Sequence, residues 1–298
     1  MKKSVLLFAL CVYIFAGCTK EPQKALDQEE CQVEVSFSND FTKSLLKSTT
    51  DEEKTLSKVV LFGVDAAGDY VAKYTIASPV VGAQPLTILK KIKTLYAIAN
   101  PTNTMEALTP DKTELDALVG DFSSAPATPL LMGGSGDIVN NEGVYWVVIT
   151  LSRAMAKVVF TSEGFTITSV KATNTPDQAY VFKQPSVAAP STATLIDTYA
   201  GVAGTDADPV YVAENANAAD ETATKFAVSG KLDNNKTVTY NITLKSGPST
   251  FLPIERNKQY NVTVKVTDTS CTVTITMPDW DDVNGGEYEI PYDDFVEE

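Results

Sequence analysis

Histidine is absent from this 298-residue chain, and arginine occurs only at Arg153 and Arg256. Without histidine, the chain cannot form a Ser–His–Asp triad, a Cys–His dyad or a His-ligated metal site. A general base would have to be a carboxylate, a lysine or a tyrosine with a shifted pKa. Because no nucleophile–base pair is evident, we predict a protein that is not an enzyme, with no catalytic residue, no metal and no cofactor.

Basic residues are scarce as a class, with 24 Lys and Arg against 38 Asp and Glu and a formal net charge of -14. Nucleic-acid binding needs a basic surface, so this balance argues against a nucleic-acid partner. Hydrophobic residues make up an ordinary 44% of the chain. That fraction supports a buried core, and the length allows one large or two ordinary domains.

Long hydrophobic runs are also missing. The longest, Val5 to Phe15, has 11 residues, whereas a membrane-spanning helix needs about 20. It follows two lysines, which predicts a secretory signal over residues 1–17. Phe15-Ala16-Gly17-Cys18 resembles a bacterial lipobox, so we expect Cys18 to carry a lipid that holds an outer-membrane precursor at the cell surface. Ordinary signal cleavage beside a chance cysteine is the alternative.

Cysteine is rare, and only Cys31 and Cys271 remain after the signal and the lipidated residue are set aside. Export would permit a disulfide between them, but the sequence cannot show that they are close. We favour two buried free thiols, and their pairing stays open at this point.

In much of the sequence, hydrophobic residues recur at every second position. Gln32 to Ser38 alternates strictly, as a strand with one buried face does. Many short segments rich in Val, Ile and aromatic residues follow, separated by turns such as 233–236. One helix is predicted from Asp111, with Glu114 completing a capping box and Gly120 ending it. The Gly133–Gly136 run is predicted to be a surface turn.

This pattern predicts an all-β fold of two tandem β-sandwiches with one or two short helices. We expect residues 48–155 and 156–280 to form the N-terminal and C-terminal sandwiches. The remaining acidic tail, residues 281–298, contains Tyr288, Ile290 and Tyr292 in alternation with acids, and Pro291 suits an edge or a bend. From Val266 onward there are ten acids and no Lys or Arg. A Ca²⁺ or catalytic role for these acids lacks a matching motif, and a solvated acidic surface is the better interpretation.

Several segments together resemble the FimA-type fimbrillin superfamily, the fimbrial subunits of Bacteroidota. One is the lipobox followed by an alternating strand. Another is Leu151–Val158, which is similar to the family's Leu-x-Arg-x-x-Ala-Lys-Val stretch, and a third is Arg256–Val262, similar to Arg-Asn-x-x-Tyr-x-Val. The resemblance implies two transthyretin-like β-sandwiches. The matching motif residues, to which we assign structural roles, are Arg153, Lys157, Arg256, Asn257 and Tyr260.

The resemblance also implies a mechanism of assembly. Proteolysis removes the first strand of an exported lipoprotein, and the C-terminal segment of another subunit fills the groove by β-augmentation. Here residues 18–47 would be the tether and removable strand. The family cleaves after Arg, but the linker 39–50 offers only Lys47 and Lys43, and we favour Lys47. The donor residues would be Tyr288, Ile290, Tyr292 and Phe295.

The leading hypothesis is therefore a fimbrial subunit that supports adhesion. Its expected partners are other fimbrial subunits, in a homopolymer, and a host or bacterial surface receptor. A lipid-retained anchor or a tip subunit of the same fimbriae is one alternative. A monomeric surface glycan-binding lipoprotein is another, which exposure of Trp146 or Trp280 beside a groove would favour. Otherwise both tryptophans are expected in the core.

Overall fold

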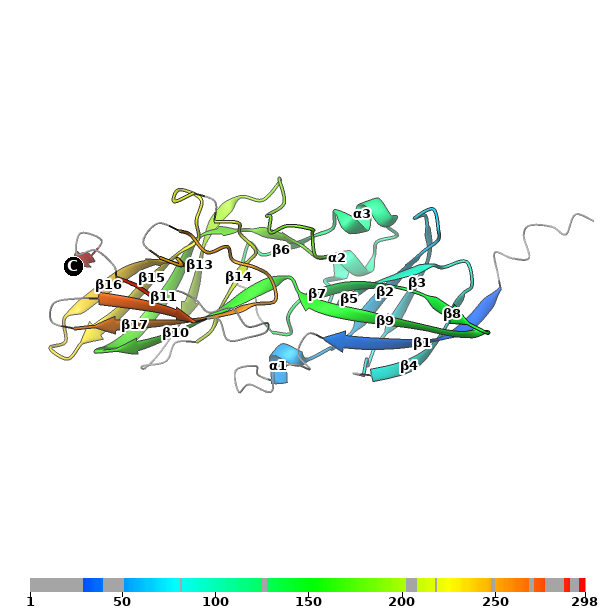
Figure 1. The fold of residues 1–298 in the computed structure, drawn as a ribbon, viewed down its shortest axis with the longest axis horizontal. Helices are drawn as coiled ribbons and strands as arrows, with labels where there is room; N and C mark the ends of the chain where they lie inside the picture. The colour runs from blue at the N-terminus through cyan, green and yellow to red at the C-terminus, as the bar shows by residue number, and fades with distance from the viewer. Residues whose placement is uncertain are drawn as a thin grey trace, which may run out of the picture.

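In the computed structural model the chain forms an elongated, nearly all-β molecule, with its N-terminal and C-terminal halves lying end to end (Figure 1). The structure describes residues 29–39, 51–80, 82–124, 128–201, 208–217, 219–247, 250–267, 271–276, 287–289 and 295–297. Among these residues, no helix is long and apolar enough to cross a membrane. The predictions for Cys18, Lys43, Lys47, Ile290 and Tyr292 fall outside the described residues.

The N-terminal half is built on an eight-stranded sheet with the order β3-β2-β5-β7-β9-β1-β4, and β8 pairs with β9. Its strands are β1 (Glu30–Asn39), β2 (Val59–Val64), β3 (Tyr70–Ile76), β4 (Gly82–Leu89), β5 (Thr94–Ala99), β7 (Met132–Asp137), β8 (Val139–Asn141) and β9 (Val144–Arg153). One face of β2, with Val59 and Leu61, packs in the main core of this half. The other face, with Val60 and Phe62, packs with residues of two short helices. Every residue of β2 is therefore buried.

The described residues form three helices, one more than the upper number expected: α1 (Asp51–Lys54), α2 (Asn103–Glu106) and α3 (Lys112–Asp116). The predicted capping box is confirmed, because Asp111 Oδ1 accepts a hydrogen bond from Glu114 N at 2.8 Å and Glu114 Oε2 accepts one from Asp111 N at 3.0 Å. The predicted end at Gly120 is wrong. The helix ends at Asp116, and Gly120 lies in β6 (Val119–Asp121).

The C-terminal half contains two five-stranded sheets, ordered β14-β10-β17-β18-β19 and β13-β11-β15-β16-β20. Their strands are β10 (Met155–Glu163), β11 (Phe165–Pro176), β13 (Leu195–Gly201), β14 (Val210–Ala213), β15 (Lys225–Leu232), β16 (Thr237–Thr243), β17 (Gln259–Val266), β18 (Cys271–Thr276), β19 (Glu287–Glu289) and β20 (Phe295–Glu297). Inward residues of both sheets, such as Phe160 and Phe226, share one core. This is the arrangement of a β-sandwich.

The chain passes from the N-terminal sheet to the C-terminal sheets at Ala154, between β9 and β10. A later segment returns across this point. Strand β12 (Gln178–Tyr180) pairs with β6, and Val181 and Phe182 join the core beneath α2 and α3. The two halves therefore share buried structure as well as a covalent link.

The prediction of a surface turn at Gly133–Gly136 is wrong, because these residues lie within β7, between β5 and β9. The reason for the glycines is close approach of neighbouring backbone. A Cβ on Gly134 would lie 2.2 Å from the carbonyl oxygen of Thr150, and one on Gly133 would lie 2.4 Å from that of Val181.

The two cysteines lie in different halves, Cys31 in β1 and Cys271 in β18, and both are free thiols. Cys271 is buried, as expected, whereas Cys31 is only half-buried. Within the described ranges, no group of three or more Cys, Asp or Glu residues could hold a metal ion.

Candidate assembly site

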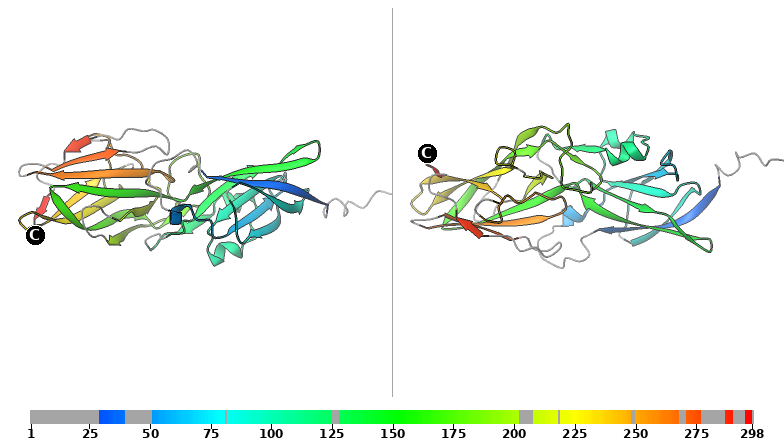
Figure 2. Two further views of the ribbon diagram at one scale, coloured as in Figure 1. Left: turned by 90° about the horizontal axis from the view of Figure 1, so that it is seen from below. Right: turned by 45° about the horizontal axis from the view of Figure 1, so that its top comes forward.

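The predicted removable strand lies inside β1, which is an interior strand of its sheet. It pairs in parallel with β9 over Val33–Asn39 and antiparallel with β4 over Glu30–Phe37. Figure 2 shows β1, in dark blue, running along β9. Because both of its edges are hydrogen-bonded, loss of β1 would leave two facing rows of unpaired backbone groups on β4 and β9.

The inward side chains of β1 belong to the core. Val33 and Val35 are 0% exposed and Phe37 is 3% exposed. On β9, Val147 lies opposite Val35 and Ile149 lies opposite Phe37, and both are fully buried. Burial of one such side chain stabilises by roughly 1.5–3 kcal/mol. Without β1, the same sheet would expose an apolar groove that demands a replacement of alternating apolar side chains.

The chain after the linker is anchored at α1 by Glu53, whose side chain is 1% exposed. Its Oε1 lies 2.8 Å from Lys157 Nζ and accepts a hydrogen bond from the Tyr211 hydroxyl. Its backbone oxygen accepts a hydrogen bond from Arg153 Nη2 at 3.1 Å. Lys157 lies in β10 and Tyr211 in β14, so α1 is tied to the C-terminal half.

The pKa values in this cluster follow from burial. Desolvation lowers the pKa of the Arg153 guanidinium, and the nearby charge of Glu53 opposes that shift. Desolvation, followed by the hydrogen bond to Glu53, raises the pKa of Tyr211. Tyr211 therefore stays a protonated donor across the physiological range, and a guanidinium does not lose its proton in proteins.

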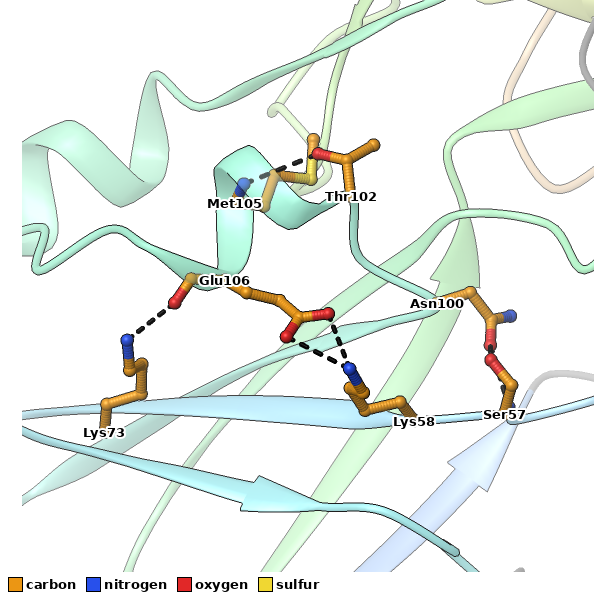
Figure 3. A network of polar contacts seen from close by, with 7 residues as sticks. All are labelled: Ser57, Lys58, Lys73, Asn100, Thr102, Met105 and Glu106. Atoms are coloured by element: carbon orange, nitrogen blue, oxygen red, sulfur yellow. Dashed lines mark hydrogen bonds and ion pairs between the residues drawn. The ribbon is translucent and has the colours of Figure 1, made fainter.

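The start of β2 has a second set of anchors, shown in Figure 3. Ser57 donates two hydrogen bonds to Asn100 Oδ1, both at 2.9 Å. Lys58 Nζ lies 2.8 Å from Glu106 Oε1, while Lys73 Nζ donates to the Glu106 backbone oxygen at 2.6 Å. None of these contacts involves β1, so they would persist in a chain that had lost that strand.

Two of the motif residues, Arg153 and Asn257, meet where the chain passes from β9 to β10. Asn257, at φ 58, accepts a hydrogen bond from the Arg153 backbone N at 3.2 Å and donates its own backbone N–H to Met155 O at 2.8 Å. Asn tolerates this left-handed conformation better than most residues. The Tyr260 hydroxyl, which is buried, donates to Pro253 O at 2.8 Å. These are structural contacts, and sequence similarity was the signal that pointed to them.

Arg256 fixes the returning segment. Its side chain is 2% exposed, and it donates hydrogen bonds to the backbone oxygens of Val181, at 3.3 Å, and Tyr180. Its Nε lies 3.8 Å from Glu214 Oε2. Burial lowers the pKa of Arg256 and raises that of Glu214, and each charge opposes the other's shift. Carbonyls and carboxylates are the partners expected for both arginines.

Two of the four proposed donor residues, Tyr288 and Phe295, lie on short strands of the same chain. Tyr288 is in β19, which pairs with β18, and Phe295 is in β20, which pairs with β16. β19 and β20 are the terminal strands of two different sheets. The acidic composition of the tail gave no sign of this pairing, which depends on sheet edges distant in sequence.

Trp146 is not a core residue, contrary to the expectation. It lies in β9 between buried Val147 and half-buried Tyr145, and its own side chain is half-buried. Strand alternation places Trp146 on the face opposite to Val147. Trp280 lies outside the described residues.

No protein-family model and no curated protein matches the sequence. Solved structures do match the fold. The tip fimbrial protein Mfa3 of Porphyromonas gingivalis, with a C-terminal truncation, aligns with a TM-score of 0.61 and 14% identity over 85% of this chain and 100% of that one. A fimbrial assembly protein of Parabacteroides distasonis gives 0.58 and 13%, covering 88% and 100%.

A FimA fimbrillin of Porphyromonas gingivalis W83 aligns with a TM-score of 0.54 and 15% identity over 80% of this chain and 90% of that one. The expected resemblance is thus confirmed at the level of the fold. The chain has a fimbrillin-like, all-β fold that it shares with these fimbrial proteins.

Proposed function

We propose that this protein is a subunit of a cell-surface fimbrium. In this proposal it is exported as a lipoprotein through Cys18, loses its first strand by cleavage after Lys47 or Lys43, and polymerises by strand exchange to support adhesion. Residues 48–155 and 156–280 would be its two working sandwiches. The observation that carries the proposal is the position of β1 as an interior, core-forming strand joined to the rest of the chain through the 40–50 linker.

The energetics favour replacement over an open groove. Removal of β1 would expose the apolar partners of Val33, Val35 and Phe37 together with two unpaired sheet edges. An incoming strand restores both the backbone pairing and the apolar burial, because its main-chain hydrogen bonds pair with the two edges and its alternating side chains fill the pockets. Glu53 and the contacts at Ser57 and Lys58 hold the remaining chain in place while this happens.

The C-terminal segment is the proposed replacement. The part of this segment that the structure describes makes two pairings of three residues each within its own chain, at β19 and β20, whereas β1 has 10 residues and two neighbours. Tyr288, Ile290 and Tyr292 supply alternating apolar side chains. Exchanging short edge pairings for a groove paired on both sides is favourable.

The test is limited proteolysis of the purified mature protein with trypsin, followed by mass spectrometry and light scattering. Cleavage after Lys47 or Lys43 should release the fragment that carries β1 and start growth of polymers. Lys43→Gln/Lys47→Gln should stay monomeric, and deletion of residues 281–298 should abolish growth. Complete cleavage with release of β1 and no oligomers would contradict the proposal.

A tip or anchor role in the same fimbriae is the second candidate, favoured by the fold similarity to the tip protein Mfa3. The linker has lysine where the resemblance implies arginine, which is also compatible with a subunit that keeps its strand and lipid. Mixing nicked subunits with intact ones separates the roles. An anchor remains uncleaved under conditions that nick a stalk subunit, and a tip subunit accepts or donates a strand at one end only.

A further inference from the structure

A basic cluster lies at one end of β1. Lys90, Lys91 and Lys93, here called the lysine mouth, follow β4 within four residues. They line a cleft of about 330 Å³ together with Glu29 and Cys31 at the beginning of β1. In a chain with a formal charge of -14, three lysines within four residues are unusual.

The acid that faces this cluster belongs to the segment proposed to leave. Lys90 Nζ forms an ion pair with the Glu29 carboxylate, which raises the pKa of Lys90. The Lys90 backbone N also donates to Glu29 O at 2.7 Å. Glu29 precedes β1, so cleavage after Lys43 or Lys47 would remove it. Lys90 would then remain at the end of an open groove without Glu29.

Charge complementarity identifies the replacement. The C-terminal stretch from Val266 has ten acids and no Lys or Arg. We infer that the lysine mouth of one subunit binds acids that precede Tyr288 in the C-terminal segment of a second copy, namely Asp281, Asp282 and Glu287. This inference rests on the proposed function and adds how the donor is recognised.

The tail repeats the order of acidic and apolar residues found in β1. In β1, Glu29 and Glu30 come first and the alternating residues Cys31, Val33, Val35 and Phe37 follow. The same order recurs in the tail, where acids come first and then Tyr288, Ile290 and Tyr292. A tail that runs in the direction of β1 therefore brings acids to the lysine mouth and three apolar side chains to the inward positions.

The experiment uses full-length chains nicked with trypsin, with the protease inhibited before assembly is followed by light scattering. Lys90→Glu/Lys93→Glu should slow growth about tenfold at low salt and flatten its salt dependence, because steering by opposite charges is screened. Lys171→Glu is the matched control. It removes an exposed lysine that is paired with Asp197 in the C-terminal half, and it should grow at the wild-type rate.

A labelled, un-nicked donor then tests the pairing between the lysines and the tail acids. Because its own groove is still filled by β1, it can donate its tail but cannot accept another. Added after protease inhibition, a donor with Asp281→Lys/Asp282→Lys/Glu287→Lys should join nicked Lys90→Glu/Lys93→Glu subunits faster than the wild-type donor does. Wild-type growth and salt dependence in the lysine variant would overturn the inference and leave the proposed function standing. Equal rates for the two donors would overturn the assignment of Asp281, Asp282 and Glu287 as the acids that are bound. Failure of nicked wild-type protein to assemble would instead count against the proposed function itself.

Discussion

Glu53 and Lys157 form a buried ion pair, with 2.8 Å between Oε1 and Nζ and side chains that are 1% and 7% exposed. Glu53 lies in α1, directly after the 40–50 linker, while Lys157 lies in the first strand of the C-terminal half. The pair therefore joins the segment that follows the proposed cleavage region to the C-terminal half. Such a link would hold α1 against the C-terminal half after cleavage.

Replacing one partner of this pair should be strongly destabilising. Glu53→Gln leaves the Lys157 ammonium buried without its counter-ion, and the loss from breaking a buried pair is about 3–5 kcal/mol. Urea unfolding followed by tryptophan fluorescence measures this difference. Lys112→Ala is the control, because it breaks an exposed pair with Asp116 and should change stability by about 0.5 kcal/mol or less. Similar losses in the two variants would show that burial of the Glu53 pair has little energetic effect.

The glycine-rich strand β7 gives a second prediction. Gly134→Ala would place a Cβ only 2.2 Å from the Thr150 carbonyl oxygen, too close for any real contact. Because that neighbour is backbone, β7 and β9 must separate, and overpacking of this kind costs about 1–3 kcal/mol. Thermal unfolding of Gly134→Ala should show it.

Ser135→Ala provides the comparison for that variant. Ser135 is exposed in the same strand, so its loss should leave the melting temperature nearly unchanged. An equal effect at both positions would mean that the spacing between β7 and β9 does not depend on glycine.

Features that depend on neighbouring residues were predictable from the sequence. The alternation of Gln32–Ser38 located β1, and Asp111 with Glu114 located the start of α3. The polar turn at 233–236 does connect β15 and β16, with Asn235 at φ 64. In each case the chemistry that sets the structure lies within a few residues of the feature.

Features that depend on distant contacts were missed. The Gly133–Gly136 run is typical of a turn until Thr150 and Val181 are known to lie against it. In the same way, α1 is held by Lys157 and Tyr211, more than a hundred residues away. The Arg256 motif was found by resemblance, but its contacts with Tyr180 and Val181 became visible only in three dimensions.

Alkaline pH should destabilise the protein through Cys271. Burial raises the pKa of this thiol to about 12, compared with roughly 8.5 in an unfolded chain. A folded-state pKa above the unfolded value gives stability that is complete below about pH 8.5 and is lost as pH rises toward 12. The free energy of unfolding should therefore fall across that range.

The Cys271→Ala variant isolates this contribution. It should be less stable at neutral pH because of the cavity, yet its stability should fall less steeply with pH than that of the wild type. Burial also raises the pKa of Tyr260 and Tyr211, but both tyrosines remain in the variant, so the difference between the two slopes reports the thiol. Identical slopes from pH 8.5 to 12 would rule out a role for Cys271 ionisation.

Arg256→Lys should loosen the returning segment selectively. A lysine cannot reproduce the planar fork that binds the backbone oxygens of both Tyr180 and Val181, because its ammonium is a single charged point. Loss of a hydrogen bond to a charged group costs about 1.5–3 kcal/mol. Hydrogen exchange followed by mass spectrometry should show faster exchange in β12 and in β6, its pairing partner.

Lys258→Arg is the control for Arg256→Lys. It changes a half-exposed neighbour that is paired with Glu255, and it should leave exchange in both strands unchanged. If Arg256→Lys lowers global stability while β6 and β12 keep their protection, then Arg256 is not what holds this segment against the N-terminal half.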